Sequence, residues 1–264
     1  MNETHINFDF IEKNVLKLAS QFSQASPFEH LIIDNFLRSP SLDTINSIIK
    51  KPDVKKRSND YIFARNKFED PKFHLLSPIF SELRDELLSS RFQNLISTIY
   101  GKKVFLDPSF LGGGLHQGGV ESYLDMHTDF SRHGSETEWL RELNLLLYLN
   151  KNYQEAWGGE LDLMNSFTGE TSSIQPKNNR LVIMLTKGHT VHGYKPIKFP
   201  KGIYRNSIAS YAYSIDTDFI KNPVKSTGWQ PNTSKVRALF GPLAIGLVKI
   251  KVALFGSNTA RKSK

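Results

Sequence analysis

A series of short apolar runs in the second half of the chain most strongly limits what this sequence can fold into. Each run is only a few residues long, and Gly, Asn or Pro separates it from the next. Several strands at such spacing are typical of a sandwich or barrel. The predicted strands cover residues 104–110, 123–127, 143–149, 160–164, 181–185 and 207–213.

The first hundred residues have a different pattern, in which helices predominate. Apolar residues recur at helical spacing from Ile11 to Phe22, and Gly101 follows a later apolar stretch as a helix stop. One short strand is expected at residues 30–37. The predicted helices cover residues 11–22, 41–50, 79–89 and 92–100, with Ser39 as the N-cap of the second. We therefore predict a fold that is mainly β with flanking helices (α+β), with helices packed on a β core of two sheets in one domain.

The cysteine count excludes several classes of protein. The 264 residues include no cysteine, which excludes disulfide scaffolds, thiolate metal sites and cysteine nucleophiles, and which suits a reducing compartment. The N-terminus lacks a basic segment followed by an apolar run, and no stretch of about 18 uncharged apolar residues occurs. The sequence therefore predicts a cytoplasmic protein with no signal peptide and no transmembrane helix.

The net charge of +8 belongs to the end of the chain. Residues 219–264 contain nine basic residues and no acidic one, whereas residues 1–218 contain 25 basic and 26 acidic residues. A nucleic-acid-binding face would normally place its basic residues on the folded body, so we expect no nucleic-acid partner. Residues 238–255 predict a helix that docks on the body; a helix that contacts a membrane surface or a partner is the alternative.

Without cysteine, a transition-metal site needs histidine and carboxylate ligands. His127 stands out among the eight histidines because Asp129 follows two residues later in a predicted strand. Residues two apart on a strand share a face, so both side chains can reach one ion, although an isolated pair is more often a surface hydrogen bond. After the apolar run at 181–185, either His189 or His192 can supply a third ligand. Two histidines and one carboxylate leave positions open on Fe(II) for a cosubstrate and oxygen.

Two further strands point polar side chains toward the same interior. Arg205 opens the last predicted strand and shares one face with Ser207 and Ala209, which leaves room for a carboxylate bound by two hydrogen bonds. In the strand at 143–149, alternation places Asn144 and Tyr148 opposite the leucine face, where buried polar groups need partners. A small keto acid could supply them. Taken singly, these residues are equally consistent with a surface ion pair and a half-buried strand.

Four stretches follow one another in order between Gly112 and Ser214. They read HTD at 127–129, RELNLLLYLN followed by WGGELDL, then VHGYKPI, and finally YRNSIASYAY. In this order and spacing they resemble the iron(II)/2-oxoglutarate-dependent dioxygenases of the prolyl 4-hydroxylase-like group. The resemblance implies a double-stranded β-helix, a jelly-roll barrel, as the core at residues 103–218. Residues 1–102 would form a helical support region of the same domain, and residues 219–264 a basic C-terminal extension.

Carried over residue by residue, the resemblance implies that His127, Asp129 and His192 bind Fe(II). The sequence context of His192 and its distance from Arg205 favour it over His189.

The resemblance also implies the contacts of the cosubstrate. Arg205 would pair with the distal carboxylate of 2-oxoglutarate, and Tyr148 would donate a hydrogen bond to it. Asn144 and Ser207 are weaker candidates that line the same pocket. His116 is expected to be structural, with a place in the pocket as the alternative.

The expected function is hydroxylation of an unactivated C–H bond in a prolyl or amino-acid residue or in a small metabolite. 2-Oxoglutarate and O2 would be consumed, succinate and CO2 released, and ascorbate would be an optional reductant. Two alternatives are an inactive barrel that serves as a binding or scaffold protein and a nucleic-acid demethylating oxygenase. The latter usually carries a second arginine six residues after the first, where this chain has Tyr211. The basic extension would allow peripheral membrane contact, and the sequence does not indicate an oligomeric state.

Overall fold

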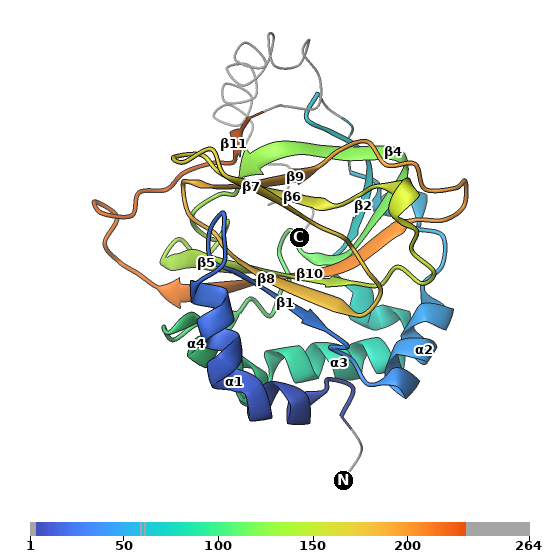
Figure 1. Cartoon of the computed structure of the whole chain (residues 1–264), viewed down its shortest axis with the longest axis horizontal. Helices are drawn as coiled ribbons and strands as arrows, with labels where there is room; N and C mark the ends of the chain where they lie inside the picture. The colour runs from blue at the N-terminus through green and yellow to red at the C-terminus, as the bar shows by residue number, and fades with distance from the viewer. Residues whose placement is uncertain (1–3, 59, 61, 231–264) are drawn as a thin grey trace.

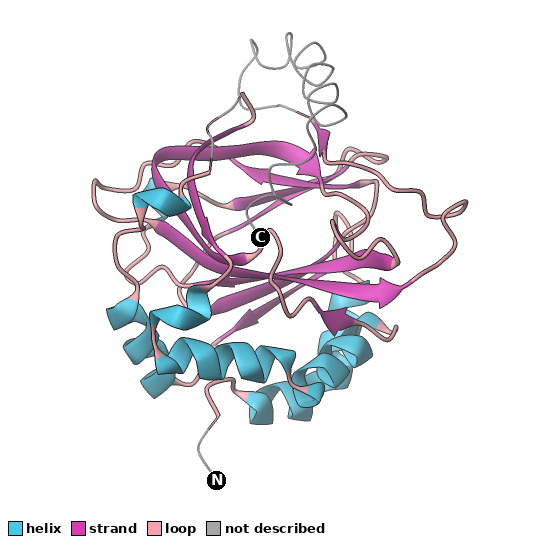
Figure 2. Ribbon diagram, turned by 180° about the vertical axis from the view of Figure 1, so that it is seen from behind, coloured by secondary structure: helices cyan, strands magenta, loops and turns pink. Residues whose placement is uncertain are grey.

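Two curved layers of antiparallel strands lie over a layer of helices in the computed structural model (Figure 1). The structure describes residues 4–58, 60 and 62–230. The view from behind shows that the helices cover only one of the two strand layers (Figure 2). This is the jelly-roll architecture, mainly β with flanking helices, that the sequence predicts.

Four helices form the supporting layer. α4 ends at Gly101, which adopts a left-handed conformation with φ of +76°, as expected for a glycine helix stop. α2 begins two residues earlier than predicted, so that Arg38 and not Ser39 occupies the N-cap position. The helices are α1 (Phe8–Ser23), α2 (Ser39–Ile48), α3 (Pro78–Leu88) and α4 (Ser90–Tyr100).

The strands form one sheet that curls into two layers. Its order is β1-β8-β5-β10-β4-β9-β6-β7, with β2 and β11 paired to β4, and β3 paired to β10. The long strand β4 joins the layers, because its first part pairs with β10 and its last part with β9. The strands are β1 (His30–Asp34), β2 (Ala64–Asp70), β3 (Phe105–Leu106), β4 (Gly114–Thr128), β5 (Trp139–Tyr148), β6 (Leu161–Asn165), β7 (Thr171–Ile174), β8 (Arg180–Leu185), β9 (Thr190–Tyr194), β10 (Arg205–Ile215) and β11 (Gly228–Trp229).

Four strands, β2, β7, β9 and β11, were not among the predicted runs. β2 reads ARNKFED and β7 reads TSSI, so neither has an apolar run. β11 has only two residues. β1 and β2 join the same sheet as the barrel strands although they lie in the N-terminal region, so the division at residue 102 stays a prediction. The predicted helix at residues 238–255 lies outside the described residues.

The core is formed where the helices meet β5. Alternation directs Leu143, Leu145 and Leu147 toward the helices, where they are almost completely buried. The opposite face of β5 turns Asn144 and Tyr148 into the barrel, as predicted. None of the described helices is long and apolar enough to cross a membrane.

Candidate functional site

Two histidines from neighbouring strands face each other inside the barrel. His127, near the end of β4, lies opposite His192 in β9, and the centroids of the two rings are 4.4 Å apart. Asp129 follows β4; its Oδ1 is 3.6 Å from His127 Nε2, and its Oδ2 is 3.5 Å from His192 Nε2. One ligand atom from each side chain lies within 4.8 Å of the others, a grouping found nowhere else in the described part of the chain. The three side chains can therefore hold one metal ion.

Both imidazoles turn Nε2 toward Asp129. His127 Nδ1 donates to the backbone oxygen of Asp125 over 2.9 Å, because a carbonyl oxygen can only accept, and this leaves Nε2 as the ligand atom. Burial lowers the pKa of His192 to about 3 and outweighs the charge of the Asp129 carboxylate, which acts in the opposite direction. Metal ligation requires a neutral imidazole, and the lowered pKa of His192 meets that requirement.

Two side chains of β5 hold the carboxylate of Asp129. Asn144 Nδ2 donates to its Oδ2 over 2.6 Å, and Arg141 Nη2 lies 3.2 Å from the same oxygen. Arg141 also donates to Asn144 Oδ1 from Nε at 2.9 Å and from Nη2 at 2.6 Å. Burial opposes ionisation of Asp129, but the positive charge of Arg141 outweighs it and holds the pKa of Asp129 well below its usual value. Asp129 is therefore a fixed anion beside the histidines.

Arg141 is absent from the predicted site, and a β-bulge explains why. In the pairing of β5 with β10, Glu142 is an extra residue, so the alternation of faces reverses there. Arg141 consequently enters the barrel on the side of Asn144. Its guanidinium carbon lies 3.5 Å from the ring centroid of Tyr211 and 4.4 Å from that of Phe130. The one signal in the sequence is an arginine beside an apolar run, since a buried cation needs an anion.

A second buried guanidinium lies at the other end of the barrel. Arg205 Nε donates to the backbone oxygen of Gly159 over 2.7 Å, and Nη2 donates to the hydroxyl of Tyr148 over 3.2 Å. Its Cζ lies 4.3 Å from the ring centroid of Tyr194. Gly159 has φ of +86°, and a Cβ there would lie 3.1 Å from Arg205 Cδ, so a side chain would displace the guanidinium. Arg205 forms no ion pair with any carboxylate in residues 4–58, 60 and 62–230, which favours an anionic ligand.

One cavity of about 210 Å³ joins these parts. The metal-ligand candidates lie along the same walls as both guanidiniums. All four predicted cosubstrate residues line it as well: Arg205, Tyr148, Asn144 and Ser207. Tyr148 accepts a hydrogen bond from Arg205 and so keeps its own proton for a ligand. Asn144, by contrast, already uses its amide group on Asp129 and Arg141.

The two remaining candidate histidines have different positions. His189 lies outside the cavity and stacks on Phe167, with ring centroids 5.2 Å apart. His116 lines the cavity on β4, and burial lowers its pKa to about 4. Glu69 and Lys67 of β2 form an ion pair at 3.1 Å and line the same wall. β2 was not predicted, and neither were these two residues.

Residues 113–213 match the protein family described as the 2OG-Fe(II) oxygenase superfamily. The match spans every residue predicted to bind metal or cosubstrate. No curated protein sequence matches the chain.

Two solved structures share the architecture. A prolyl hydroxylase from Trichoplax adhaerens, in complex with a hypoxia inducible factor oxygen degradation domain peptide fragment, is 16% identical with a TM-score of 0.55. That alignment covers 81% of this chain and 94% of that chain. Prolyl 4-hydroxylase from Phytophthora capsici is 15% identical with a TM-score of 0.54, and the alignment covers 92% of this chain and 76% of that chain. At these identities the likeness is one of fold.

Proposed function

We propose that the chain is a dioxygenase that hydroxylates an unactivated C–H bond, because residues 113–213 match the 2OG-Fe(II) oxygenase superfamily, as the resemblance predicts. The observation that carries this proposal is the convergence of His127, Asp129 and His192 in one cavity with Arg205. 2-Oxoglutarate would be converted to succinate and CO2. An inactive barrel would have no need of a complete ligand set and a buried anion site together.

The donor set fits Fe(II). Two neutral imidazoles and one carboxylate form the facial arrangement found in non-haem iron oxygenases, which leaves positions open for a cosubstrate and O2. An iron bound there would supply the redox chemistry that couples decarboxylation of 2-oxoglutarate to oxidation of the substrate. In this scheme His127, Asp129 and His192 hold the ion, while Asn144 and Arg141 orient the carboxylate of Asp129.

The far end of the cavity fits the distal carboxylate of 2-oxoglutarate. Arg205 would bind it through its guanidinium, and the hydroxyl of Tyr148 would donate to it. Both side chains are buried, with 7% of Arg205 and none of Tyr148 exposed. Because little water reaches these side chains, the ion pair between Arg205 and the carboxylate would be strong. The 2-oxoglutarate molecule would then extend from Arg205 toward the histidines. Ser207 is small enough to leave space between the two ends.

Three substrate classes fit the proposal: a peptidyl proline, a free amino acid and a small metabolite. The Trichoplax enzyme was solved with a peptide of hypoxia inducible factor, which supports testing prolyl peptides first. A coupled succinate assay over peptides and metabolites, with mass spectrometry for one added oxygen, would identify the class.

A pair of histidine variants tests the proposed reaction. His192→Ala should abolish Fe(II) binding and succinate release, because it removes one of three ligands. His189→Ala is the matched control, since this histidine lies close to His192 in the sequence but outside the cavity. It should keep both activities. If the protein binds neither Fe(II) nor 2-oxoglutarate and releases no succinate, the enzymatic proposal is wrong.

A further inference from the structure

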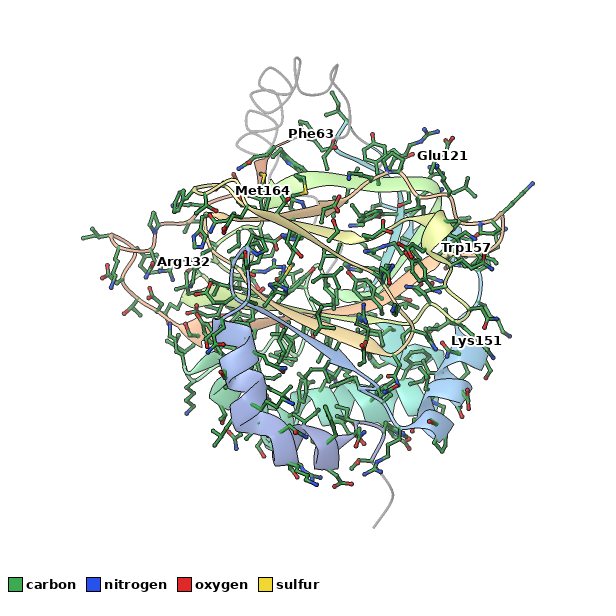
Figure 3. All side chains as sticks on the ribbon, in the orientation of Figure 1. Phe63, Glu121, Arg132, Lys151, Trp157 and Met164 are labelled. Atoms are coloured by element: carbon green, nitrogen blue, oxygen red, sulfur yellow. The ribbon has the colours of Figure 1, made fainter. Side chains whose placement is uncertain are left out.

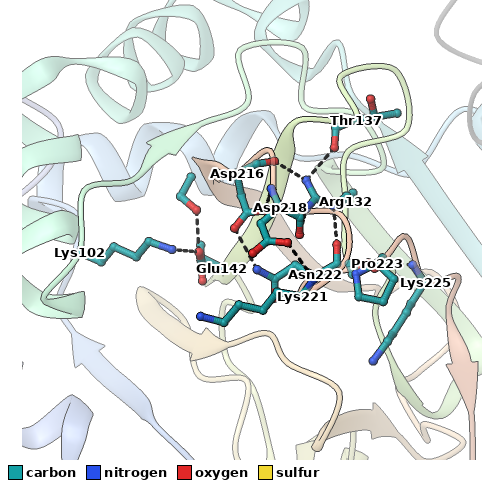
Figure 4. Close-up of polar contacts among 12 residues, drawn as sticks. Lys102, Arg132, Thr137, Glu142, Asp216, Asp218, Lys221, Asn222, Pro223 and Lys225 are labelled. Atoms are coloured by element: carbon teal, nitrogen blue, oxygen red, sulfur yellow. Dashed lines mark hydrogen bonds and ion pairs between the residues drawn. The ribbon is translucent and has the colours of Figure 1, made fainter.

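The chain runs back toward β4 after β10 ends at Ile215. We call residues 216–230 the return segment. Arg132, whose side chain is fully buried, holds its first part (Figure 4). Arg132 Nη2 donates to Asp216 Oδ1 over 2.6 Å, and Nε donates to the backbone oxygen of Asn222 over 2.9 Å. The guanidinium also lies 4.2 Å from the ring centroid of Phe219. One side chain therefore fixes residues 216–222 to the loop that follows Asp129.

The second part of the return segment is hydrogen-bonded to the loop that follows Asp129 and to β4, the strand that carries His127. The Ser131 amide donates to the backbone oxygen of Lys225 over 3.0 Å, and the Lys225 amide donates to Ser131 Oγ over 2.8 Å. Beyond this link, β11 pairs with β4, and Trp229 lies opposite His127. The return segment thus places Trp229 beside the candidate metal site.

The indole of Trp229 contacts two other rings. Its centroid is 5.0 Å from that of His127, and it stacks on Phe63 at 4.9 Å with an angle of 15° between the planes. Phe63 comes from the segment before β2 and lies at the end of the barrel where β11 joins β4 (Figure 3). Trp229 and Thr227 line the same cavity as the metal-ligand candidates.

The two ends of this cavity differ in exposure. Arg205 and Tyr148 are buried at one end, whereas Phe130, Thr227 and Trp229 are all partly exposed at the other. If 2-oxoglutarate occupies the end with Arg205 and Tyr148, the partly exposed residues beside the histidines border a route for the substrate. Trp229 is the largest of these three residues, and its indole packs against the stacked ring of Phe63 and the tilted ring of His127.

We propose that Trp229 is a specificity-determining residue, whose indole limits the width of the group that can approach the metal. This rests on the proposed function. The favoured substrate presents a narrow, C–H-rich group that packs along the indole, and wider groups are excluded by contact with it. Arg132 is a positioning residue that acts through the return segment.

Metal-binding probes of graded size test the proposal without a known substrate. Protein loaded with Co(II) is titrated with azide, imidazole and 4-phenylimidazole, and binding is followed by the visible absorption of the metal. Trp229→Ala should bind 4-phenylimidazole at least about tenfold more tightly than the native protein, while azide affinity changes less than about twofold. Trp157→Ala is the matched control, because this tryptophan packs near Phe199 outside the cavity, and it should change neither affinity.

The outcomes separate the possible roles of Trp229. Equal 4-phenylimidazole affinity in Trp229→Ala and native protein would overturn the proposal. Weaker Co(II) binding with unchanged probe selectivity would also overturn it, since Trp229 would then serve only to pack His127. Trp229→Phe, which keeps a stacked ring, should give an intermediate 4-phenylimidazole affinity, and a thermal unfolding curve checks that each variant folds. Failure of native protein to bind Co(II) would instead overturn the proposed function, and this inference with it.

Discussion

Two neighbouring residues of β5, Arg141 and Glu142, belong to two buried charged networks that differ in how completely they are satisfied. The inner network consists of Asp129, Asn144 and Arg141 and faces the barrel. Both side chains of β5 contact the same oxygen of Asp129, Oδ2, while Oδ1 faces His127. Arg141 Nη1 is buried with no hydrogen-bond partner among the described residues.

The outer network surrounds Glu142 on the helix side of the sheet. Oε1 accepts from Lys102 Nζ at 2.5 Å and from Ser214 Oγ at 2.6 Å, and Oε2 accepts from Tyr100 at 2.6 Å and from Lys187 Nζ at 2.5 Å. Figure 4 shows Lys102 beside this carboxylate. Four donors from three segments of the chain thus use both oxygens.

The difference distinguishes a site that binds a ligand from a contact that holds the fold together. Buried polar atoms normally have partners, so the unpaired Arg141 Nη1, in a cavity where Asp129 Oδ1 faces only a candidate metal-binding histidine, indicates that partners are supplied from outside the chain. The outer network has no such capacity left. The one-residue bulge between the two networks allows adjacent side chains to serve both purposes.

The largest expected effect comes from removing the inner carboxylate. Asp129→Ala should reduce succinate release by at least about 10³-fold, because one of three metal ligands is lost. Co(II) titration should show no specific binding. Glu142→Ala removes a carboxylate from the adjacent network and should still bind Co(II). A comparable loss of Co(II) binding in both variants would show that the two networks do not differ in this way.

The outer carboxylate should matter for stability instead. Glu142→Ala should lower the free energy of unfolding by roughly 2–3 kcal/mol, since a buried carboxylate with four donors is removed. The loss is moderated because the Lys102 side chain is 50% exposed and can be rehydrated. Urea unfolding of metal-free protein measures it, and Co(II) affinity should stay within about threefold of native. Unchanged stability would show that the outer network does not hold the fold together.

Asn144 allows a finer test of the inner network. Asn144→Ala should weaken Co(II) binding by about 10–100-fold, because the hydrogen bond that orients Asp129 is lost. The control is Asn150→Ala, a buried asparagine just beyond the same strand whose amide donates to Pro176. That variant should lose stability while it retains native Co(II) affinity. Calorimetric titration of both variants decides whether Asn144 serves the metal or only the packing of β5.

The smallest effect is a dependence of stability on pH. The pKa of Glu142 is lowered to about 2 because hydrogen bonds from Lys102, Lys187, Ser214 and Tyr100 outweigh burial, which alone would raise it. A carboxyl group whose pKa is lower in the folded than in the unfolded chain stabilises the fold. This stabilisation is complete at pH values above the unfolded-state pKa, near 4.5, and is lost as the pH falls toward 2. The stability advantage of native protein over Glu142→Gln should therefore shrink by about 1 kcal/mol between about pH 4.5 and about pH 3.5. A constant difference between the two proteins over this range would contradict the assignment.

Much of the candidate site follows from strand alternation and the family resemblance. The two-residue spacing of His127 and Asp129, and the inward face of Tyr148, need only the period of a strand. Arg205 was predicted from its place at the start of a strand with small residues beyond it. The preference for His192 over His189 rested on the resemblance, and the structure brings His192 to Asp129.

What the sequence could not supply depends on irregular or long-range pairing. Arg141 enters the barrel only because of a bulge, which alternation does not foresee. β2 carries many charged residues, so its place beside β4 depends on tertiary context and not on strand propensity. Trp229 belongs to a region predicted as a basic extension, and nothing local indicates that two residues there pair with the metal-ligand strand.

The pairing of β1 with β8 has a consequence for how the protein folds. Leu31 lies opposite Ile183, so a strand near the N-terminus completes a sheet whose other strands come much later in the chain. Pairings over such distances have a large loop-closure cost and form slowly compared with local structure. His127 and His192 also meet only through a pairing between distant strands. We therefore expect the helices to form early in refolding and the capacity to bind metal to arise among the last events, so that metal binding reports completion of the barrel.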